Sequence, residues 1–159
     1  MSVYRDKQRN TWFVVTRYKD WTGKAKQTTK RGFRTKYDAQ RYESLFIDKK
    51  KDSTDILFKN FVEIYLESME YRIKENTLMT KQNIFYHHIV PYLGEMKLDE
   101  ITPKDIIHWQ DQVMKDNNYK QTYLKTIHNQ LSALFNYAVR FYGLKSNPAR
   151  LAGNMGKEE

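Results

Sequence analysis

The stretch from Thr122 to Pro148 constrains the fold of this chain most, because it has one unambiguous helical period. Apolar residues at steps of three and four place these side chains on one side of a helix: Leu124, Ile127, Leu131, Leu134, Phe135, Ala138 and Tyr142. The opposite side is polar and carries Lys125, Asn129, Ser132, Asn136 and Arg140. We expect Thr122 to cap the helix and Gly143, in a left-handed conformation, to end it.

Acidic residues are missing from this helix and its surroundings. From Asn117 to Arg150 there are five Lys or Arg and no Asp or Glu, and the stretch from Asn76 to Gly94 is also free of acids. A surface that lies on nucleic-acid phosphates would explain the absence, because carboxylates are repelled there. The alternative is a solvated basic face.

The charge distribution predicts two modules in the 159 residues. Residues 1–55 hold 15 Lys or Arg against 7 Asp or Glu, net +8, whereas residues 56–159 hold 13 against 12, net +1. A first module that binds a polyanion largely by charge, and a second with a more local patch, would explain this division.

Several classes of protein and site are excluded by what the sequence lacks. The chain has no cysteine, so disulfides and thiolate metal sites are excluded, and this fits a reducing cytosol. The N-terminus lacks a signal-peptide core, and no apolar run approaches the roughly 20 residues that span a bilayer. We therefore expect a soluble, cytoplasmic protein without membrane contact.

A small antiparallel sheet is predicted first, with strands at residues 2–7, 12–18 and 26–33 and a turn from Asp20 to Gly23. Thr35 is expected to cap a following helix, with Asp38 at its third position. This helix should cover one face of the sheet and leave the other free to enter a DNA major groove.

Strand parity assigns Arg17 and Lys30 to the free face, opposite to Trp12 and Phe33. The residues predicted to contact DNA from the sheet are Arg5, Lys7, Arg17, Lys26, Thr28 and Lys30. An ordinary basic hairpin surface is the alternative interpretation.

Four helices are predicted after the charged stretch 48–55, which is the best candidate for a linker. Thr102-Pro103 opens the third helix as N-cap and first-position proline. The first and third helices are acidic outside, whereas the second and fourth are free of acids, so the latter two should share a face that meets nucleic acid. The predicted contact set on that face is Thr77, Lys81, Lys120, Thr122, Lys125 and Asn129.

These motifs, in this order, resemble the tyrosine recombinases of the phage and conjugative-transposon integrase type. Thr77 with HHIVPYLG, then LDEITPKDIIHW, then the series from Asn129 to Pro148 resemble the core-binding domain. Trp12 on a strand, the Asp20 to Lys24 turn and RGFRTKYDAQ resemble the arm-binding domain. The expected fold class is therefore α+β: a three-stranded antiparallel sheet with one helix at residues 1–52, a linker at 53–57, an all-α four-helix SAM-like domain at 58–150 and a tail at 151–159.

The resemblance implies the DNA-binding portion of a site-specific integrase, which binds arm-type and core-type sites for DNA integration and recombination in a bacterial cell that hosts a phage or mobile element. Double-stranded DNA at attachment sites and other integrase protomers of the full-length protein are the implied partners. That family cleaves DNA with a separate C-terminal domain. Here the sequence stops at Lys157-Glu158-Glu159 and holds no His-x-x-Arg box, so we assign no catalytic residue and expect no DNA cleavage by this chain.

Other chemistry has little support in the sequence. His87 and His88 point about 100° apart on a helix and no third ligand is placed by spacing, so we expect no metal site. No Gly-rich phosphate loop occurs, and we expect no cofactor and no small-molecule substrate. His108 and His128 are expected in capping, packing or phosphate contacts. A non-catalytic DNA-binding transcriptional regulator is the competing class, and a protein-interaction adaptor with Tyr-rich helical surfaces is a third.

Overall fold

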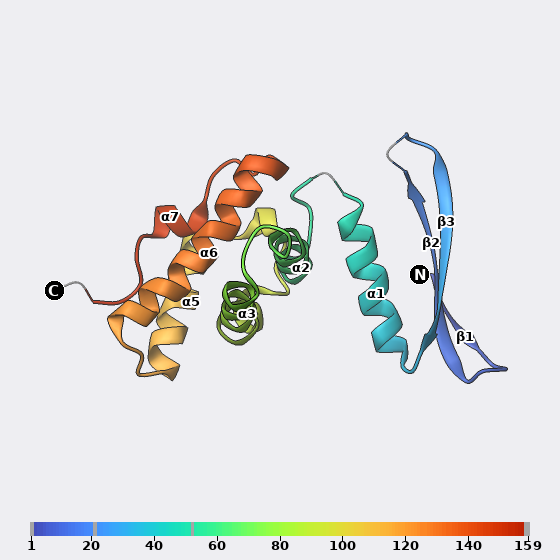
Figure 1. Ribbon diagram of the computed structural model, residues 1–159, viewed down its shortest axis with the longest axis horizontal. Coiled ribbons are helices and arrows are strands. Elements are labelled where there is room, and N and C mark those ends of the chain that lie inside the picture. Colours follow the sequence, from blue (N-terminus) through green and yellow to red (C-terminus); the bar gives the residue numbers. More distant parts are fainter. Residues whose placement is uncertain (1, 21, 52, 158–159) are drawn as a thin grey trace. The chain divides into compact units, whose positions relative to one another are not determined.

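The computed structural model describes residues 2–20, 22–51 and 53–157 of the chain (Figure 1). The chain divides between Lys51 and Asp52 into two compact units, each of which is described by itself. Trp21 of the predicted turn, Asp52 at the end of the first predicted domain, and Glu158 and Glu159 of the predicted tail lie outside the described residues.

The first unit is a three-stranded antiparallel sheet in the order β1-β2-β3, with one helix. Its strands are β1 (Val3–Asp6), β2 (Thr11–Lys19) and β3 (Ala25–Phe33). Helix α1 (Lys36–Lys49) follows, and the Thr35 hydroxyl accepts a hydrogen bond from the Asp38 amide at 3.1 Å, so the predicted cap is confirmed. The predicted α+β class with this sheet and helix is confirmed.

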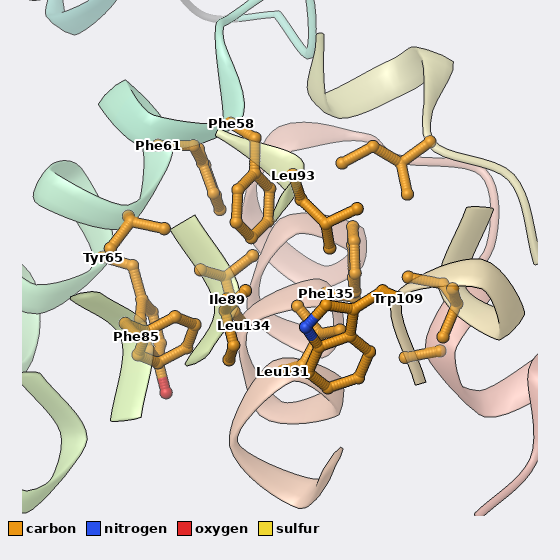
Figure 2. Close-up of a cluster of buried hydrophobic side chains, with 14 of the residues drawn as sticks. Phe58, Phe61, Tyr65, Phe85, Ile89, Leu93, Trp109, Leu131, Leu134 and Phe135 are labelled. Carbon is orange, nitrogen blue, oxygen red and sulfur yellow. The ribbon is translucent and has the colours of Figure 1, made fainter. Parts of the chain in front are cut away.

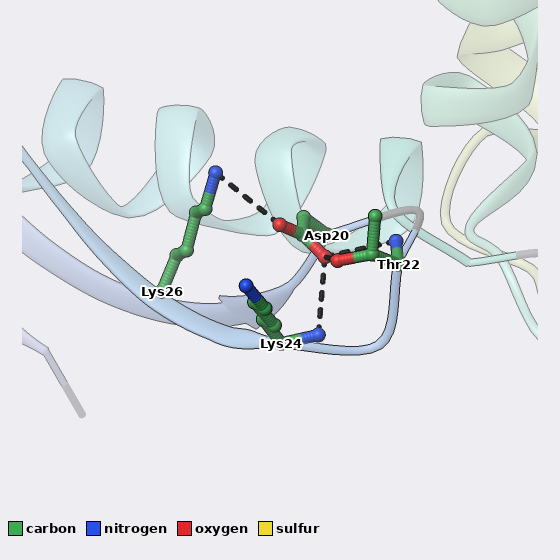
Figure 3. Close-up of polar contacts among 4 residues, drawn as sticks. All are labelled: Asp20, Thr22, Lys24 and Lys26. Atoms are coloured by element: carbon green, nitrogen blue, oxygen red, sulfur yellow. Dashed lines mark hydrogen bonds and ion pairs between the residues drawn. The ribbon is translucent and has the colours of Figure 1, made fainter.

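The turn between β2 and β3 is organised by Asp20 (Figure 3). One carboxylate oxygen accepts hydrogen bonds from the Thr22 amide at 2.9 Å and the Lys24 amide at 3.0 Å, and the other lies 3.2 Å from Lys26 Nζ. The Thr22 hydroxyl, which also donates to this carboxylate, holds the pKa of Asp20 below its usual value. Gly23 completes the turn at a φ of 86°, a conformation that favours glycine.

The second unit is helical from its start to its end. It contains α2 (Phe58–Met69), α3 (Glu75–Ile84), the π-helical segment η1 (Phe85–Ile89), α4 (Val90–Leu93), the 3₁₀ turn η2 (Leu98–Glu100), α5 (Pro103–Asp116), α6 (Gln121–Tyr142) and α7 (Pro148–Ala152). At the start of α5, Thr102 and Asp105 form a reciprocal capping box, which confirms the predicted helix start.

The core of this unit lies between α2, η1, α5 and α6 (Figure 2). Helix α6 contributes the predicted apolar side, and Leu131, Leu134 and Phe135 on it are fully buried. Phe58 and Phe61 of α2 and Trp109 of α5 are buried against them. Burying one such aromatic stabilises a fold by about 3–5 kcal/mol relative to truncation to alanine, so these rings hold the helices together.

The predicted second helix is interrupted in the structure. It runs as α3, widens into η1 and resumes as α4, where Pro91 lacks the N–H that a continuous helix would use. The Val90 amide bonds to Phe85 five residues earlier, and the His88 carbonyl accepts from Trp109 Nε1 at 2.7 Å. The wider turn thus ties the second predicted helix to the third.

The predicted cap of α6 needs correction, and a further short helix follows its end. The helix begins at Gln121, with Lys120 before it, and no side chain caps it, so Thr122 lies inside the helix. Gly143 ends the helix at a φ of 74°, as predicted. Asn147-Pro148 does more than stop the chain, because Asn147 caps the additional short helix α7 through bonds from the Ala149 and Arg150 amides.

Two residues of the predicted linker at 53–57, Ile56 and Leu57, pack within the helical unit. Ile56 is fully buried in the helical unit, and its carbonyl accepts a hydrogen bond from the Leu98 amide at 2.7 Å. Leu57 forms a β-bridge with Lys97. The packing of the helical unit therefore starts before Phe58.

Candidate nucleic-acid interface

Helix α1 covers one face of the sheet in the first unit. On that face Val14 is 1% exposed and Thr16 is 4% exposed. The rings of Tyr18 and Phe46 lie 5.4 Å apart, and those of Phe33 and Tyr42 lie 5.3 Å apart. Since Trp12 has the same parity as Val14 and pairs with Phe33, both aromatics are on the helix side, as predicted.

A β-bulge changes the face of the three predicted DNA contacts that lie on β3. Trp12 pairs with Phe33 and Val14 pairs with Lys30, so β3 spans three residues where β2 spans two. Gly32, with a φ of 92°, lies in the bulge. The extra residue reverses the parity of β3, and Lys30 therefore lies on the same side as Val14, not opposite to Phe33.

The predicted face was wrong for four of the six sheet residues, three of them on β3 because of the bulge and Arg5 because of its regular pairing with Trp12. Register places Arg5, Lys26, Thr28 and Lys30 on the helix side of the sheet, paired with Trp12, Tyr18, Thr16 and Val14. Arg5, Lys26 and Lys30 are nevertheless exposed, Arg5 on edge strand β1 and the two lysines on edge strand β3. Lys7 lies in the turn after β1, and Arg17 is on the open face and exposed, as predicted. Contact of any of them with DNA stays a prediction.

The open face carries a different set of side chains from the one expected. Register places these residues on it: Tyr4, Asp6, Thr11, Phe13, Val15, Arg17, Lys19, Ala25, Gln27 and Thr29. Arg31 lies in the bulge, and its contact with the Phe13 ring places it on the same face. The Arg31 guanidinium lies 4.6 Å from the Phe13 ring centroid and 3.7 Å from an Asp6 carboxylate oxygen, which together hold it over the sheet. The Tyr4 ring lies 5.6 Å from that of Phe13 and is 51% exposed. The isolated Gly32 in a strand pattern is the sequence signal that could have revealed Arg31.

In the second unit, α3 with η1 packs beside α6, as expected for helices that share a surface. Lys81 Nζ donates to Gln130 Oε1 at 2.7 Å, and His88 Nε2 lies 3.0 Å from the Tyr123 hydroxyl. Five of the six predicted contact residues are exposed in this unit: Thr77, Lys120, Thr122, Lys125 and Asn129.

Lys81 differs from the other five because it is engaged inside the unit. Its ammonium also donates to the Tyr65 hydroxyl at 3.0 Å and lies 5.3 Å from the Tyr65 ring centroid. Burial lowers the pKa of Lys81 and raises that of Tyr65, since each loses hydration of its charged form. Lys81 therefore bridges α2, α3 and α6, a role that its charge and spacing did not indicate.

His88 and His128 have structural partners, whereas His108 is exposed and its predicted contact stays a prediction. His128 is buried, with Nδ1 3.1 Å from Gln110 Nε2, which also donates to the Gly153 carbonyl at 2.9 Å. Burial lowers the pKa of His128, and burial with the neighbouring His87 lowers that of His88. Among residues 2–20, 22–51 and 53–157, no three His, Asp or Glu side chains come together as metal ligands.

Two family descriptions match the chain, one for each unit. Residues 2–50 match "Arm DNA-binding domain", and residues 57–114 match "Phage integrase, N-terminal SAM-like domain". Among curated proteins, none matches this chain in sequence.

Similar folds occur among solved structures. A lambda integrase dimer bound to a COC′ core site is 20% identical and aligns over 99% of this chain and 46% of its own, with a TM-score of 0.58. A lambda integrase tetramer bound to a Holliday junction is 18% identical over 99% of this chain and 48% of its own, with a TM-score of 0.57. The integrase-like domain from Bacillus cereus is 14% identical over 67% of this chain and 88% of its own, with a TM-score of 0.59.

None of the described helices is both long enough and apolar enough to cross a bilayer.

Proposed function

We propose a function from the premise that this chain carries the arm DNA-binding domain and the N-terminal SAM-like domain of the phage integrases. The chain is the DNA-binding portion of a site-specific integrase, in which the first unit binds arm-type sites and the second binds core-type sites during recombination. Both matched domains are non-catalytic, and we assign no catalytic residue to them. Duplex DNA is the partner of both units, and other integrase protomers are partners of the whole protein.

The open face of the sheet is the observation that carries the proposal. Arg17, Gln27, Thr29 and Arg31 are exposed there, on the face of the sheet opposite to α1, in the part of the chain with a net charge of +8. A major groove about 12 Å wide admits a two-stranded ribbon. Arginine pairs with guanine through two hydrogen bonds, and glutamine does so with adenine, so this face supplies the side chains that read base edges.

The residues on the rim of the sheet serve in positioning. Four exposed cations lie at the margins of the sheet: Arg5 on edge strand β1, Lys26 and Lys30 on edge strand β3, and Lys7 in the β1–β2 turn. Thr28, beside Lys26 and Lys30 on β3, is partly buried. We assign the four cations to backbone phosphates, which fix register on the duplex without reading sequence.

The second unit uses the surface that α3 and α6 share. Lys120 and Lys125 supply positive charge, and Thr77, Thr122 and Asn129 are neutral donors in stretches without acids. Lys81 acts indirectly, because its bonds to Tyr65 and Gln130 hold α3 against α6.

The test is selection of binding sites from a random duplex library with the whole 159-residue chain, followed by affinity measurements on the selected sequence. Arg17→Ala should weaken binding by about 1–3 kcal/mol and relax the preference at one position. Arg41→Ala on α1 is the matched control, because it removes an exposed arginine from the same unit outside the sheet. A library that yields no preferred sequence, or equal losses for the two variants, would contradict the proposal.

A further inference from the structure

A cleft in the second unit, at the C-terminal ends of α2 and α6, has no role in the function proposed above. It has a volume of about 350 Å³. Its lining residues are Tyr65, Met69, Arg72, Ala133, Asn136, Tyr137, Arg140 and Phe141. No Asp or Glu is among these described lining residues, and two of them are arginines.

Aromatic rings form a column along this cleft. The Tyr65 and Tyr137 ring centroids are 5.3 Å apart, and those of Tyr137 and Phe141 are 4.9 Å apart. Phe141 at the outer end is 60% exposed, an unusual state for a phenylalanine. The column therefore ends in an apolar ring that faces solvent.

Cations lie at both ends of the column. At the inner end Lys81 Nζ is 5.3 Å from the Tyr65 ring, and at the outer end the Arg140 guanidinium is 5.2 Å from the Phe141 ring. Arg72 on the rim is held by Nη1, which donates to the Ser68 carbonyl at 2.9 Å and hydroxyl at 3.1 Å. Tyr137 donates to the same hydroxyl at 3.2 Å, so a guanidinium and a ring are fixed through one serine.

The acids of α2 are turned away from this cleft. Tyr65 and Met69, four residues apart, share one side of α2, and Arg72 in the turn after the helix lines the same cleft. Glu67, by its spacing of two from Tyr65 and Met69, lies about 160–200° away around the helix axis. The cleft thus combines positive charge with exposed aromatic surface, and its outer wall continues the acid-free polar side of α6.

We propose that the cleft binds an unpaired nucleotide of a single DNA strand. The base stacks on Phe141, at the end of the Tyr65–Tyr137 column, and the adjoining phosphates pair with Arg72 and Arg140. Stacking on an aromatic side chain beside basic groups is the general mode by which proteins hold single strands, because every base has a π-face. The inference rests on the proposed nucleic-acid function of the α6 surface, and it extends that function from duplex to unpaired DNA.

The experiment uses the whole chain and a short, fluorescently labelled oligothymidylate, with affinity measured by anisotropy at fixed salt. Phe141→Ala should weaken binding roughly 5- to 150-fold, the range for loss of one stacked base. Phe141→Trp should retain the affinity, whereas Phe141→Leu should lose it, because leucine keeps apolar contact without a π-face. Tyr71→Ala is the matched control, since Tyr71 is 83% exposed next to Arg72 but does not line the cleft.

A site-specific readout and a duplex titration complete the test. Oligothymidylate should shift the ring proton resonances of Phe141 and the side-chain Nε–H resonance of Arg140. Equal binding by the parent and Phe141→Ala overturns the inference, as does full affinity of Phe141→Leu, which would show that the aromatic face is not needed. An equal loss in Tyr71→Ala overturns it as well. Parallel titrations with a duplex test the proposed function separately. If the parent binds duplex but its binding of oligothymidylate does not depend on Phe141, the inference about the cleft is rejected and the proposed function is not.

Discussion

Arg31 and Lys30 are adjacent in sequence and lie on opposite faces of the sheet, and the bulge at Gly32 decides that Arg31 is the one on the open face. The Arg31 side chain is 52% exposed, and Phe13 and Asp6 hold its guanidinium over the open face. Arg31 should therefore lose little side-chain conformational entropy when it contacts a base. We expect Arg31→Ala to remove a bidentate pair with guanine worth about 1–3 kcal/mol, which is roughly 5- to 150-fold in Kd.

Lys30→Ala should behave differently because Lys30 lies on the helix side of edge strand β3 and is assigned to a backbone phosphate. Loss of one phosphate contact should lower the slope of log K against log salt by about 0.9 and leave sequence preference unchanged. Arg31→Lys should keep the salt slope of the parent but lose preference, because an ammonium has no planar fork for guanine. Both residues are exposed, so the free energy of unfolding of every variant should lie within about 0.5 kcal/mol of that of the parent.

The assay is fluorescence anisotropy of the whole chain with a selected duplex, at several salt concentrations and with single base changes in the duplex. A loss of preference in Lys30→Ala together with an unchanged preference in Arg31→Ala would refute the reasoning. That outcome would mean that the parity of β3 is regular in solution and that the bulge does not place Arg31.

Three further predictions concern the second unit. Asn147→Ala should lower its free energy of unfolding by about 3 kcal/mol, because the buried amide caps α7 and donates to Ser132 and Asn136; in chemical denaturation the exposed Asn118→Ala should change it by under about 0.5 kcal/mol. Burial lowers the pKa of His128 from 6.5, so the folded state binds fewer protons than the unfolded state and stability should fall as the pH drops below 6.5; His128→Gln should flatten that dependence, and an unchanged pH profile would count against it. Lys125→Glu should abolish binding of a core-type duplex, whereas Glu67→Lys on α2 should leave it unchanged or slightly stronger; a footprint with the reverse pattern would place the DNA on the other face.

Local patterns in the sequence were sufficient for the elements whose bonds are local. The cap of α1 joins Thr35 to Asp38, and the capping box of α5 joins Thr102 to Asp105, each within one turn of helix. The apolar period of α6 likewise predicts its buried side, because a helix repeats every 3.6 residues whatever surrounds it. Thr122 shows the limit of this reasoning, since a good capping residue stands one position inside a helix that begins without a side-chain cap.

By itself the sequence determined the two modules, the sheet with its helix and the buried side of α6, because composition and period are properties of single segments. The acid-free stretch that starts at Asn76 does not make an acid-free helix, since α3 begins at Glu75. The tertiary structure alone decided which side chains meet. Parity on β3 depends on the partner strand, so a one-residue bulge moved Lys30 off the open face and Arg31 onto it. Lys81 had the sequence signature of a phosphate contact, yet Tyr65 and Gln130, 16 and 49 residues away, engage its ammonium inside the unit. The charge and spacing of a residue indicate which groups it can bind, but packing between distant segments determines which groups it contacts.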